Sequence, residues 1–176
     1  MSARDLVHAL SSTQPFQHLE DSQLRVLAER MEIVHLDEGA SVFDEGDVGD
    51  SWYLILSGEI TIVRHGGNGS PSHTLASLER GDSFGEMALL EGTPRMASAS
   101  AFSASRLGRL PRESFDALLA DHHPSATQLL RHMSKALCQR LRDVTFILQD
   151  IVDNPAPMRT TPSALTKLMH AVMAHN

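Results

Sequence analysis

The sequence predicts an α+β, mainly β fold: an antiparallel double-stranded β-helix, or jelly-roll barrel, flanked by N-terminal helices and a long C-terminal helix. Between Glu32 and Arg109, short apolar runs alternate with turn residues at intervals of about 8 to 12 residues, which is typical of small antiparallel barrels. From Ser125 to about Val152 no proline or glycine interrupts a helical pattern. The 176 residues, 41% of them hydrophobic, can bury one core. We expect N-terminal helices in 1–31, a β-roll in 32–110, C-terminal helices in 111–152, and a linker with a short helix in 153–176.

The first part contains two helix candidates. Arg4 to Leu10 forms the first, and Asp21 or Ser22 can cap the second through a side-chain oxygen. The second helix presents one apolar face, formed by Leu24, Leu27, Ala28 and Met31.

The β-roll is predicted from short runs that end in turn residues. Trp52 to Leu56 is a dense apolar strand that closes at Ser57-Gly58, and a glycine-rich loop from Gly66 to Pro71 joins two strands as a hairpin. The remaining runs are 34–36, 42–43, 60–64, 75–78, 97–102 and 105–110.

The C-terminal part is helical. Pro111 suits the first position of a helix that extends to about Ala120, and His122-His123-Pro124 breaks it. The long helix that follows carries apolar residues at spacings of three and four: Leu130, Met133, Leu137, Leu141, Val144, Leu148 and Ile151. This stripe predicts either a homodimer paired through residues 125–152 or a helix folded back on its own barrel. A last helix, Ser163 to His175, either docks an effector protein or packs on the same domain.

Composition excludes several classes. The formal charge of −7 disfavours a nucleic-acid partner. The single cysteine, Cys138, excludes an intrachain disulfide and a four-thiolate metal site.

We expect no membrane span and a cytoplasmic location, since no long apolar stretch and no signal-peptide pattern occur. A metal-dependent barrel enzyme is disfavoured because no His-x-His pair is present, and no nucleophile-and-base motif is found. We therefore expect no metal, no cofactor and no enzymatic activity.

The segment from Phe84 to Ser98 carries the chemistry. Gly85 permits a tight turn, and the following residues can form a short helix whose first N–H groups attract a phosphate. Gly92-Thr93-Pro94 then returns the chain as a strand that carries Arg95. A guanidinium can hold two phosphate oxygens, and the Glu86 carboxylate can accept a hydrogen bond from a ribose hydroxyl.

This segment resembles the phosphate-binding cassette of cyclic-nucleotide-binding domains. It matches the family pattern at Phe84, Gly85, Glu86, Met87, Ala88, Leu89, Pro94, Arg95 and Ala97. Further matches precede it, in the family's order: Pro15-Phe16, Leu19, Leu24, Leu27, Ala28, Met31, Gly39, Phe43, Gly46-Asp47, Gly49-Asp50, Tyr53 to Leu56, Ser57-Gly58 and Gly81-Asp82. The resemblance covers roughly residues 13 to 150.

The resemblance implies a site. Arg95 would hold the exocyclic oxygens of a cyclic phosphate with the N–H groups of Ala88 and Ala97, and Glu86 would bind the ribose 2′-hydroxyl. From the residues alone, a structural Arg95 paired with an acid and a Glu86 that only caps its helix remain open. The expected ligand-binding residues are Gly85, Glu86, Met87, Ala88, Arg95, Met96 and Ala97.

Base identity follows from the position after the arginine. In the family, a threonine or serine there favours guanine, whereas this chain has Met96, so we expect cAMP in preference to cGMP. Expected wall or lid positions are Ile62, Leu75, Phe84 and Thr145. Ile62 and Leu75 could equally be ordinary core residues, and Thr145 could be a neighbour of the apolar stripe of the helix.

We therefore expect a non-enzymatic sensor in which ligand binding moves the C-terminal helix. Residues 153–176 number 24, too few for the winged helix-turn-helix domain of the family's transcription regulators. Two alternatives stay open: an interaction module that keeps the fold without the ligand, and a sensor fragment of a larger regulator or channel.

Overall fold

The computed structural model describes residues 3–13, 16–66 and 71–153, without the side chains of residues 3–5, 140, 143, 144, 147, 148 and 150–153. The predicted helix from Ser163 to His175 lies outside the described residues. Within them, no helix is both long enough and apolar enough to cross a membrane.

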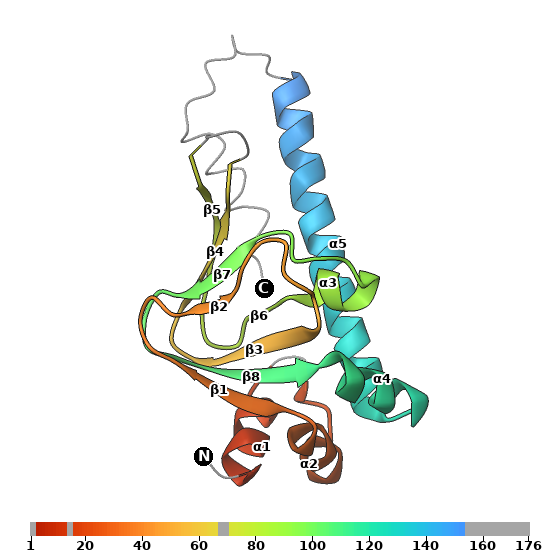
Figure 1. Ribbon diagram of the computed structural model, residues 1–176. Coiled ribbons are helices and arrows are strands. Elements are labelled where there is room, and N and C mark those ends of the chain that lie inside the picture. Colours follow the sequence, from red (N-terminus) through yellow and green to blue (C-terminus); the bar gives the residue numbers. More distant parts are fainter. Residues whose placement is uncertain (1–2, 14–15, 67–70, 154–176) are drawn as a thin grey trace.

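Two antiparallel four-stranded sheets form a β-roll (Figure 1), which confirms the predicted mainly β barrel. One sheet has the strand order β1-β8-β3-β6 and the other β2-β7-β4-β5. Their bounds are β1 (Glu32–Leu36), β2 (Ser41–Phe43), β3 (Ser51–Ser57), β4 (Ile60–Arg64), β5 (His73–Leu78), β6 (Ser83–Phe84), β7 (Ser98–Ala101) and β8 (Ser105–Pro111).

Strand β3 is buried on both faces. Its side chains alternate, so Trp52 and Leu54 face a cluster formed with the helices while Tyr53 and Ile55 face the space between the two sheets. A strand covered on both sides reads as a continuous apolar run, which explains the dense pattern of this segment. The strand therefore connects the helical cluster to the interior of the barrel.

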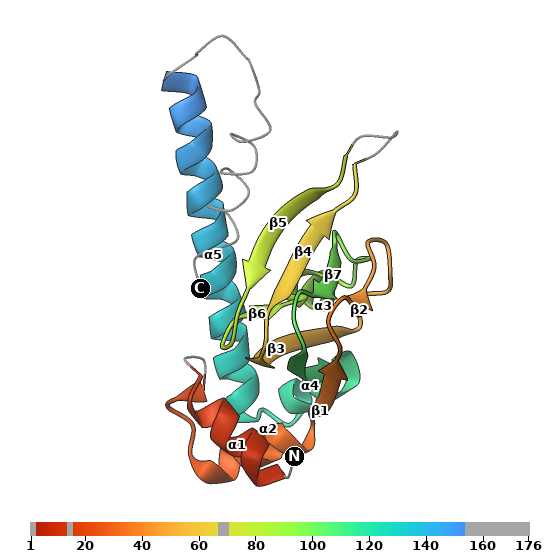
Figure 2. The same ribbon diagram turned by 90° about the vertical axis from the view of Figure 1, so that its left-hand side faces the viewer.

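The N-terminal helices α1 (Ala3–Ser11) and α2 (Asp21–Glu29) pack under the β1-β8-β3-β6 sheet (Figures 1 and 2). The predicted cap of α2 at Asp21 or Ser22 is wrong. Glu20 is the N-cap, because its N–H donates to Oε1 of Gln23 at 3.0 Å in a capping box.

Strand β8 leads directly into helix α4 (Arg112–Ala120). Pro111 is the N-cap in an extended conformation (ψ 150°), so the helix begins one residue later than predicted. After α4, His122 adopts a positive φ of 52° and the chain enters helix α5 (Pro124–Asp153). Figure 2 shows α5 rising from α1 and α2 along one side of the barrel.

The apolar stripe of α5 is divided between two environments. Of the predicted stripe, Met133 is fully buried in the cluster with α1, α2 and α4, and Leu130 packs against that cluster, so the first turns of α5 pack on the chain's own domain. Farther along, the stripe residue Leu141 is 68% exposed, and Phe146, outside the stripe, is 74% exposed. The predicted stripe members Val144, Leu148 and Ile151 have side chains outside the described part of the chain. The fold-back interpretation therefore applies to the first turns of α5, and pairing with a second copy of the helix stays a prediction.

Candidate functional site

Helix α3 (Glu86–Glu91) lies between β6 and β7 and is bounded by two glycines. Gly85 is its N-cap at φ 85°, and Gly92 is its C-cap at φ 71°. The first intrahelical bond is donated by the Leu89 N–H to the Gly85 carbonyl at 3.3 Å. The N–H groups of Met87 and Ala88 therefore have no acceptor within the helix.

Gly85 is required for a second reason. A Cβ at this position would lie 2.7 Å from Nη1 of Arg95 and 3.0 Å from the Ser51 carbonyl oxygen. Any other residue would push the guanidinium out of place, in addition to the strain of a positive φ.

Arg95 lies just before β7 rather than in a strand as predicted. Its N–H donates to the Asp47 carbonyl at 2.8 Å and its carbonyl accepts from the Gly46 N–H at 2.9 Å. These two bonds fix its backbone to the loop between β2 and β3. The side chain is thereby directed inward and is only 4% exposed.

The guanidinium of Arg95 is held by carbonyls and an aromatic ring. Nη1 donates to the Gly85 carbonyl at 3.0 Å, and Nη2 donates to the Ser51 carbonyl at 2.8 Å. Cζ lies 4.1 Å from the centroid of the Phe43 ring, a cation–π contact. Nε is buried and has no hydrogen-bond partner among the described residues. The group is thus positioned while donor capacity remains unused.

No carboxylate forms an ion pair with Arg95 within the part of the chain that the structure describes. Burial lowers the pKa of Arg95, and the electrostatic interactions with Tyr53, Asp50 and Glu86 oppose that shift without cancelling it. An arginine side chain stays protonated in proteins, so the site contains a buried cation. A buried charge is costly unless an anion approaches it.

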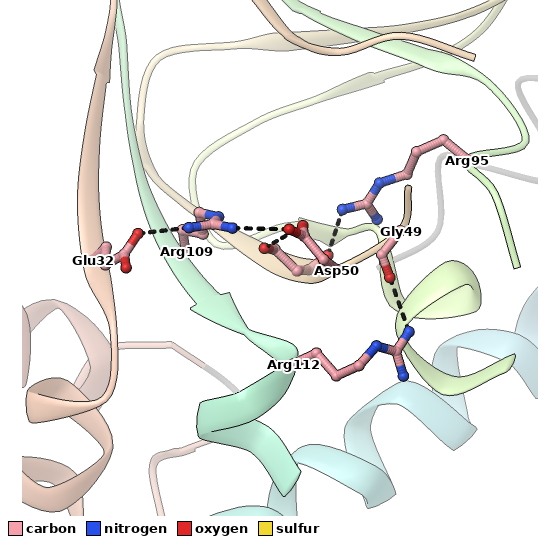
Figure 3. A network of polar contacts seen from close by, with 7 residues as sticks. Glu32, Gly49, Asp50, Arg95, Arg109 and Arg112 are labelled. Atoms are coloured by element: carbon pink, nitrogen blue, oxygen red, sulfur yellow. Dashed lines mark hydrogen bonds and ion pairs between the residues drawn. The ribbon is translucent and has the colours of Figure 1, made fainter. Parts of the chain in front are cut away.

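A second polar network joins the same loop to β1 and β8 (Figure 3). Arg109 on β8 donates to Glu32 at 2.7 Å and to Asp50 at 3.4 Å. Burial raises the pKa of the Asp50 carboxyl, but a hydrogen bond from Ser51 and the charge of Arg109 outweigh it, so the pKa is lowered overall. This network fixes the residues that precede the Ser51 carbonyl.

These elements surround a pocket that opens to solvent. Its lining comprises Phe43, Ile62, Leu78, Phe84, Gly85, Glu86, Met87, Ala88, Arg95, Met96 and Ala97. All seven residues expected to bind the ligand are in this lining, as are the expected wall residues Ile62 and Phe84. Only Glu86 and Arg95 bring charged side chains to it.

Two expected positions are elsewhere. Leu75 is half-buried on β5 and packs against the barrel core, but it does not line the pocket. Thr145 is exposed on α5, where its hydroxyl donates to the Leu141 carbonyl at 2.8 Å. Sequence reasoning missed Phe43 and Leu78 as lining residues, because strand residues facing a pocket and strand residues facing the core have the same alternation.

Glu86 and Met96, two of the expected ligand-binding residues, differ in exposure. Glu86 is 3% exposed in the first turn of α3, whereas Met96 is 52% exposed at the pocket. Among the described residues, no three histidine, cysteine, aspartate or glutamate side chains gather as metal ligands would.

Comparison with known proteins identifies the family. Residues 33–122 match the model of the cyclic nucleotide-binding domain. The chain belongs to this family. The match contains α3, the pocket lining and the strands that carry them, so the resemblance inferred from the cassette is confirmed.

Relatives of this cyclic nucleotide-binding domain include regulators. The chain is 31% identical over 150 residues to a CRP-like cAMP-activated global transcriptional regulator of Mycobacterium tuberculosis, covering 85% of this chain and 65% of the relative. It is 34% identical over 113 residues to a cAMP-dependent protein kinase regulatory subunit of Aspergillus niger, covering 64% of this chain and 25% of that protein. The chain therefore spans less than two thirds of the length of these relatives.

Solved structures agree with the fold. A cyclic nucleotide-binding domain from Methylobacillus flagellatus superposes with a TM-score of 0.69 at 26% identity, over 80% of this chain and 79% of the other. The β-roll, the cassette helix and the flanking helices therefore have the arrangement of a known domain type.

Proposed function

We propose that this chain is a non-enzymatic cyclic nucleotide sensor that acts in the cytoplasm and binds cAMP in preference to cGMP. Ligand binding would close α5 toward the pocket and so pass the signal to a partner. The proposal goes beyond family membership in naming the ligand, the contacts and the response.

The observation that carries the proposal is the state of Arg95. Its guanidinium is buried, has no carboxylate partner among the described residues, and keeps a buried Nε–H without an acceptor beside the pocket. An anion in the pocket could accept from Nε and a neighbouring Nη in a bidentate contact. The N–H groups of Met87 and Ala88, which have no acceptor within the helix, supply further donors, and the Glu86 carboxylate can accept from a sugar hydroxyl. A cyclic phosphate ester on a ribose satisfies these groups together.

The preference for cAMP rests on the rest of the lining. Ile62, Leu78, Met87 and Met96 are apolar, so they offer surface to a base but no hydrogen bond to its edge. Guanine carries more polar groups than adenine and would lose more hydration in such surroundings.

A homodimer paired through the far half of α5 is part of the proposal. Leu141 and Phe146 are exposed on this half, whereas the near half packs on its own domain. Exposed apolar side chains of this kind suit a second copy of the same helix. Sedimentation of wild type and Leu141→Glu tests this: a dimer that becomes a monomer supports it, and an unchanged monomer contradicts it.

Thermal melts test the ligand. A ligand at a hundred times its dissociation constant should add about 2.7 kcal/mol to the free energy of unfolding. We expect this stabilisation with cAMP at lower concentration than with cGMP, and none with 5′-AMP at either concentration. Arg95→Leu should abolish it. The control Arg64→Leu removes an exposed arginine from β4 and should retain the stabilisation, since Arg64 lies outside the pocket lining and contacts Glu45 at 3.9 Å on the surface.

One competing function has a specific observation in its favour. Two carbonyls and the Phe43 ring already hold the guanidinium, as a purely structural arginine would be held. An interaction module without ligand would show no stabilisation by any cyclic nucleotide, and Arg95→Leu would then lower stability without changing any ligand response.

A further inference from the structure

The position of Arg95 depends on the short loop between β2 and β3, and Arg112 binds that loop as well. Arg112 is the first residue of α4. Its N–H donates to the Asp50 carbonyl at 2.7 Å, and its Nη2 donates to the Gly49 carbonyl at 2.9 Å. Asp50 is followed directly by Ser51, whose carbonyl accepts from Arg95.

The same nitrogen of Arg112 also contacts the cassette helix. Nη2 donates to the Ala88 carbonyl at 2.8 Å, so one atom joins α3 to the loop. The two segments are already in close contact, because a Cβ on Gly49 would lie 2.1 Å from Cβ of Ala88. Figure 3 shows Arg112 reaching from α4 toward Gly49, with Arg95 on the other side of the loop.

We propose that Arg112 is the positioning residue that couples the occupied pocket to α4 and, through α4, to α5. This inference rests on the proposed function and deepens it by naming the residue that carries the response. An anion bound to Arg95 changes the strength of the hydrogen bond from Arg95 to the Ser51 carbonyl. Asp50 and Gly49 precede Ser51 in the chain, so a shift of this carbonyl also displaces the acceptors of Arg112. Because coupling between two sites is reciprocal, the contact also sets the affinity of the pocket.

The geometry dictates which substitutions matter. Nη2 of Arg112 donates both side-chain hydrogen bonds. The ammonium of a lysine carries three donors on one nitrogen, so it can make both of them. A methionine has similar length and no donor. Arg112→Met should therefore uncouple the helix from the pocket, and Arg112→Lys should restore most of the coupling.

Arg30→Met is the matched control. Arg30 is the C-cap of α2 and lies 3.7 Å from Asp121, the C-cap of α4, so its removal also takes an arginine contact from the end of α4. Among the described residues, no hydrogen bond or ion pair joins Arg30 to the cassette or to the loop. A merely structural effect on α4 would appear in this variant as well.

The test uses cAMP titrations and a distance measurement on the full chain. Cys138 is the single cysteine and is exposed on α5, so it accepts a spin label, and Glu38→Cys in the exposed turn after β1 accepts the second. Labelled chain is diluted with a large excess of unlabelled chain, so that only distances within one chain are recorded. Circular dichroism verifies that each variant is folded.

We expect cAMP to change the label distance in wild type, in Arg30→Met and in Arg112→Lys. Arg112→Met should lose the change and bind cAMP about tenfold more weakly. Wild-type affinity with a full distance change in Arg112→Met would overturn the inference while the proposed function stands. So would cAMP binding to wild type without any distance change. If wild type binds no cyclic nucleotide, or if Arg95→Leu binds as well as wild type, the proposed function fails and the inference fails with it.

Discussion

The pocket lining has two parts that are built differently. In the cationic part, Arg95 is fixed by two carbonyls, an aromatic ring and two backbone bonds to a loop that is itself tied to β8. In the apolar part, Ile62, Leu78, Met87 and Met96 offer surface only, and Met96 is half-exposed. Directional bonds fix a geometry, whereas apolar contact tolerates variation in shape. For the proposed ligand, we therefore predict strict recognition of the sugar phosphate and looser recognition of the base.

The strongest challenge to the cationic part is Gly85→Ala. The added Cβ meets Nη1 of Arg95 at 2.7 Å, so the guanidinium must move. We expect cAMP affinity to fall by about 10- to 100-fold, the equivalent of one charge-assisted hydrogen bond, as measured by calorimetry. The free energy of unfolding should also fall by about 1–2 kcal/mol because of the positive φ.

Gly92→Ala is the control for this strain. Gly92 has a φ of 71° at the other end of α3, and a Cβ there would meet nothing within 4 Å. It should lose similar stability and keep the affinity for cAMP. Equal losses of affinity in both variants would mean that strain in α3, rather than the position of Arg95, governs binding.

Phe43→Leu sharpens the comparison, because Phe43 touches the guanidinium of Arg95 and also lines the pocket. Loss of a cation–π contact is worth about 0.5–2 kcal/mol, so we expect cAMP to bind about 2- to 30-fold more weakly. Phe102→Leu, on a ring that is 63% exposed and outside the pocket, should bind as wild type does. Unchanged binding in Phe43→Leu would show that the carbonyls alone position the arginine.

The apolar part is challenged by Met96→Thr. A hydroxyl at this position can hydrogen-bond a guanine amino group, which methionine cannot do. We expect the ratio of cGMP to cAMP affinity to rise about fivefold, the value of one neutral hydrogen bond. Met96→Leu keeps the surface apolar and should leave the ratio as it is. A ratio that responds equally to both substitutions would mean that bulk, not polarity, determines the preference.

The smallest expected effect concerns Asp50, which supports the cationic part from the loop. Its pKa is lowered in the folded protein, so it contributes stability at a pH above its unfolded pKa and loses that contribution as the pH falls through the folded pKa. The difference in melting temperature between wild type and Asp50→Asn should therefore shrink from about pH 7 to about pH 3. A constant difference over this range would contradict the lowered pKa.

The sequence predicted the cationic part better than the apolar part, for physical reasons. Gly85 and Arg95 lie ten positions apart in one segment, and a glycine turn, a short helix and an arginine are visible locally. Phe43 and Leu78 reach the pocket only when the two sheets close, which no local pattern reveals. Arg112 was missed because its acceptors are backbone carbonyls 24 and 63 positions away, and a carbonyl has no sequence signature.

The bounds of the long helix were predicted almost to the residue, but the sequence did not predict which part of its apolar stripe packs on the chain's own core. Leu130 and Leu141 belong to one apolar stripe by spacing, but only the first packs against the chain's own core. Periodicity predicts which face of a helix is apolar, and it does not predict what covers that face.

The most direct test of the central claim is a crystal structure of this chain with cAMP. The account predicts that an exocyclic phosphate oxygen lies within hydrogen-bond distance of Arg95 Nε, with the guanidinium still bonded to the carbonyls of Gly85 and Ser51. A phosphate bound away from Arg95, or a pocket filled by protein atoms with cAMP elsewhere, would contradict it.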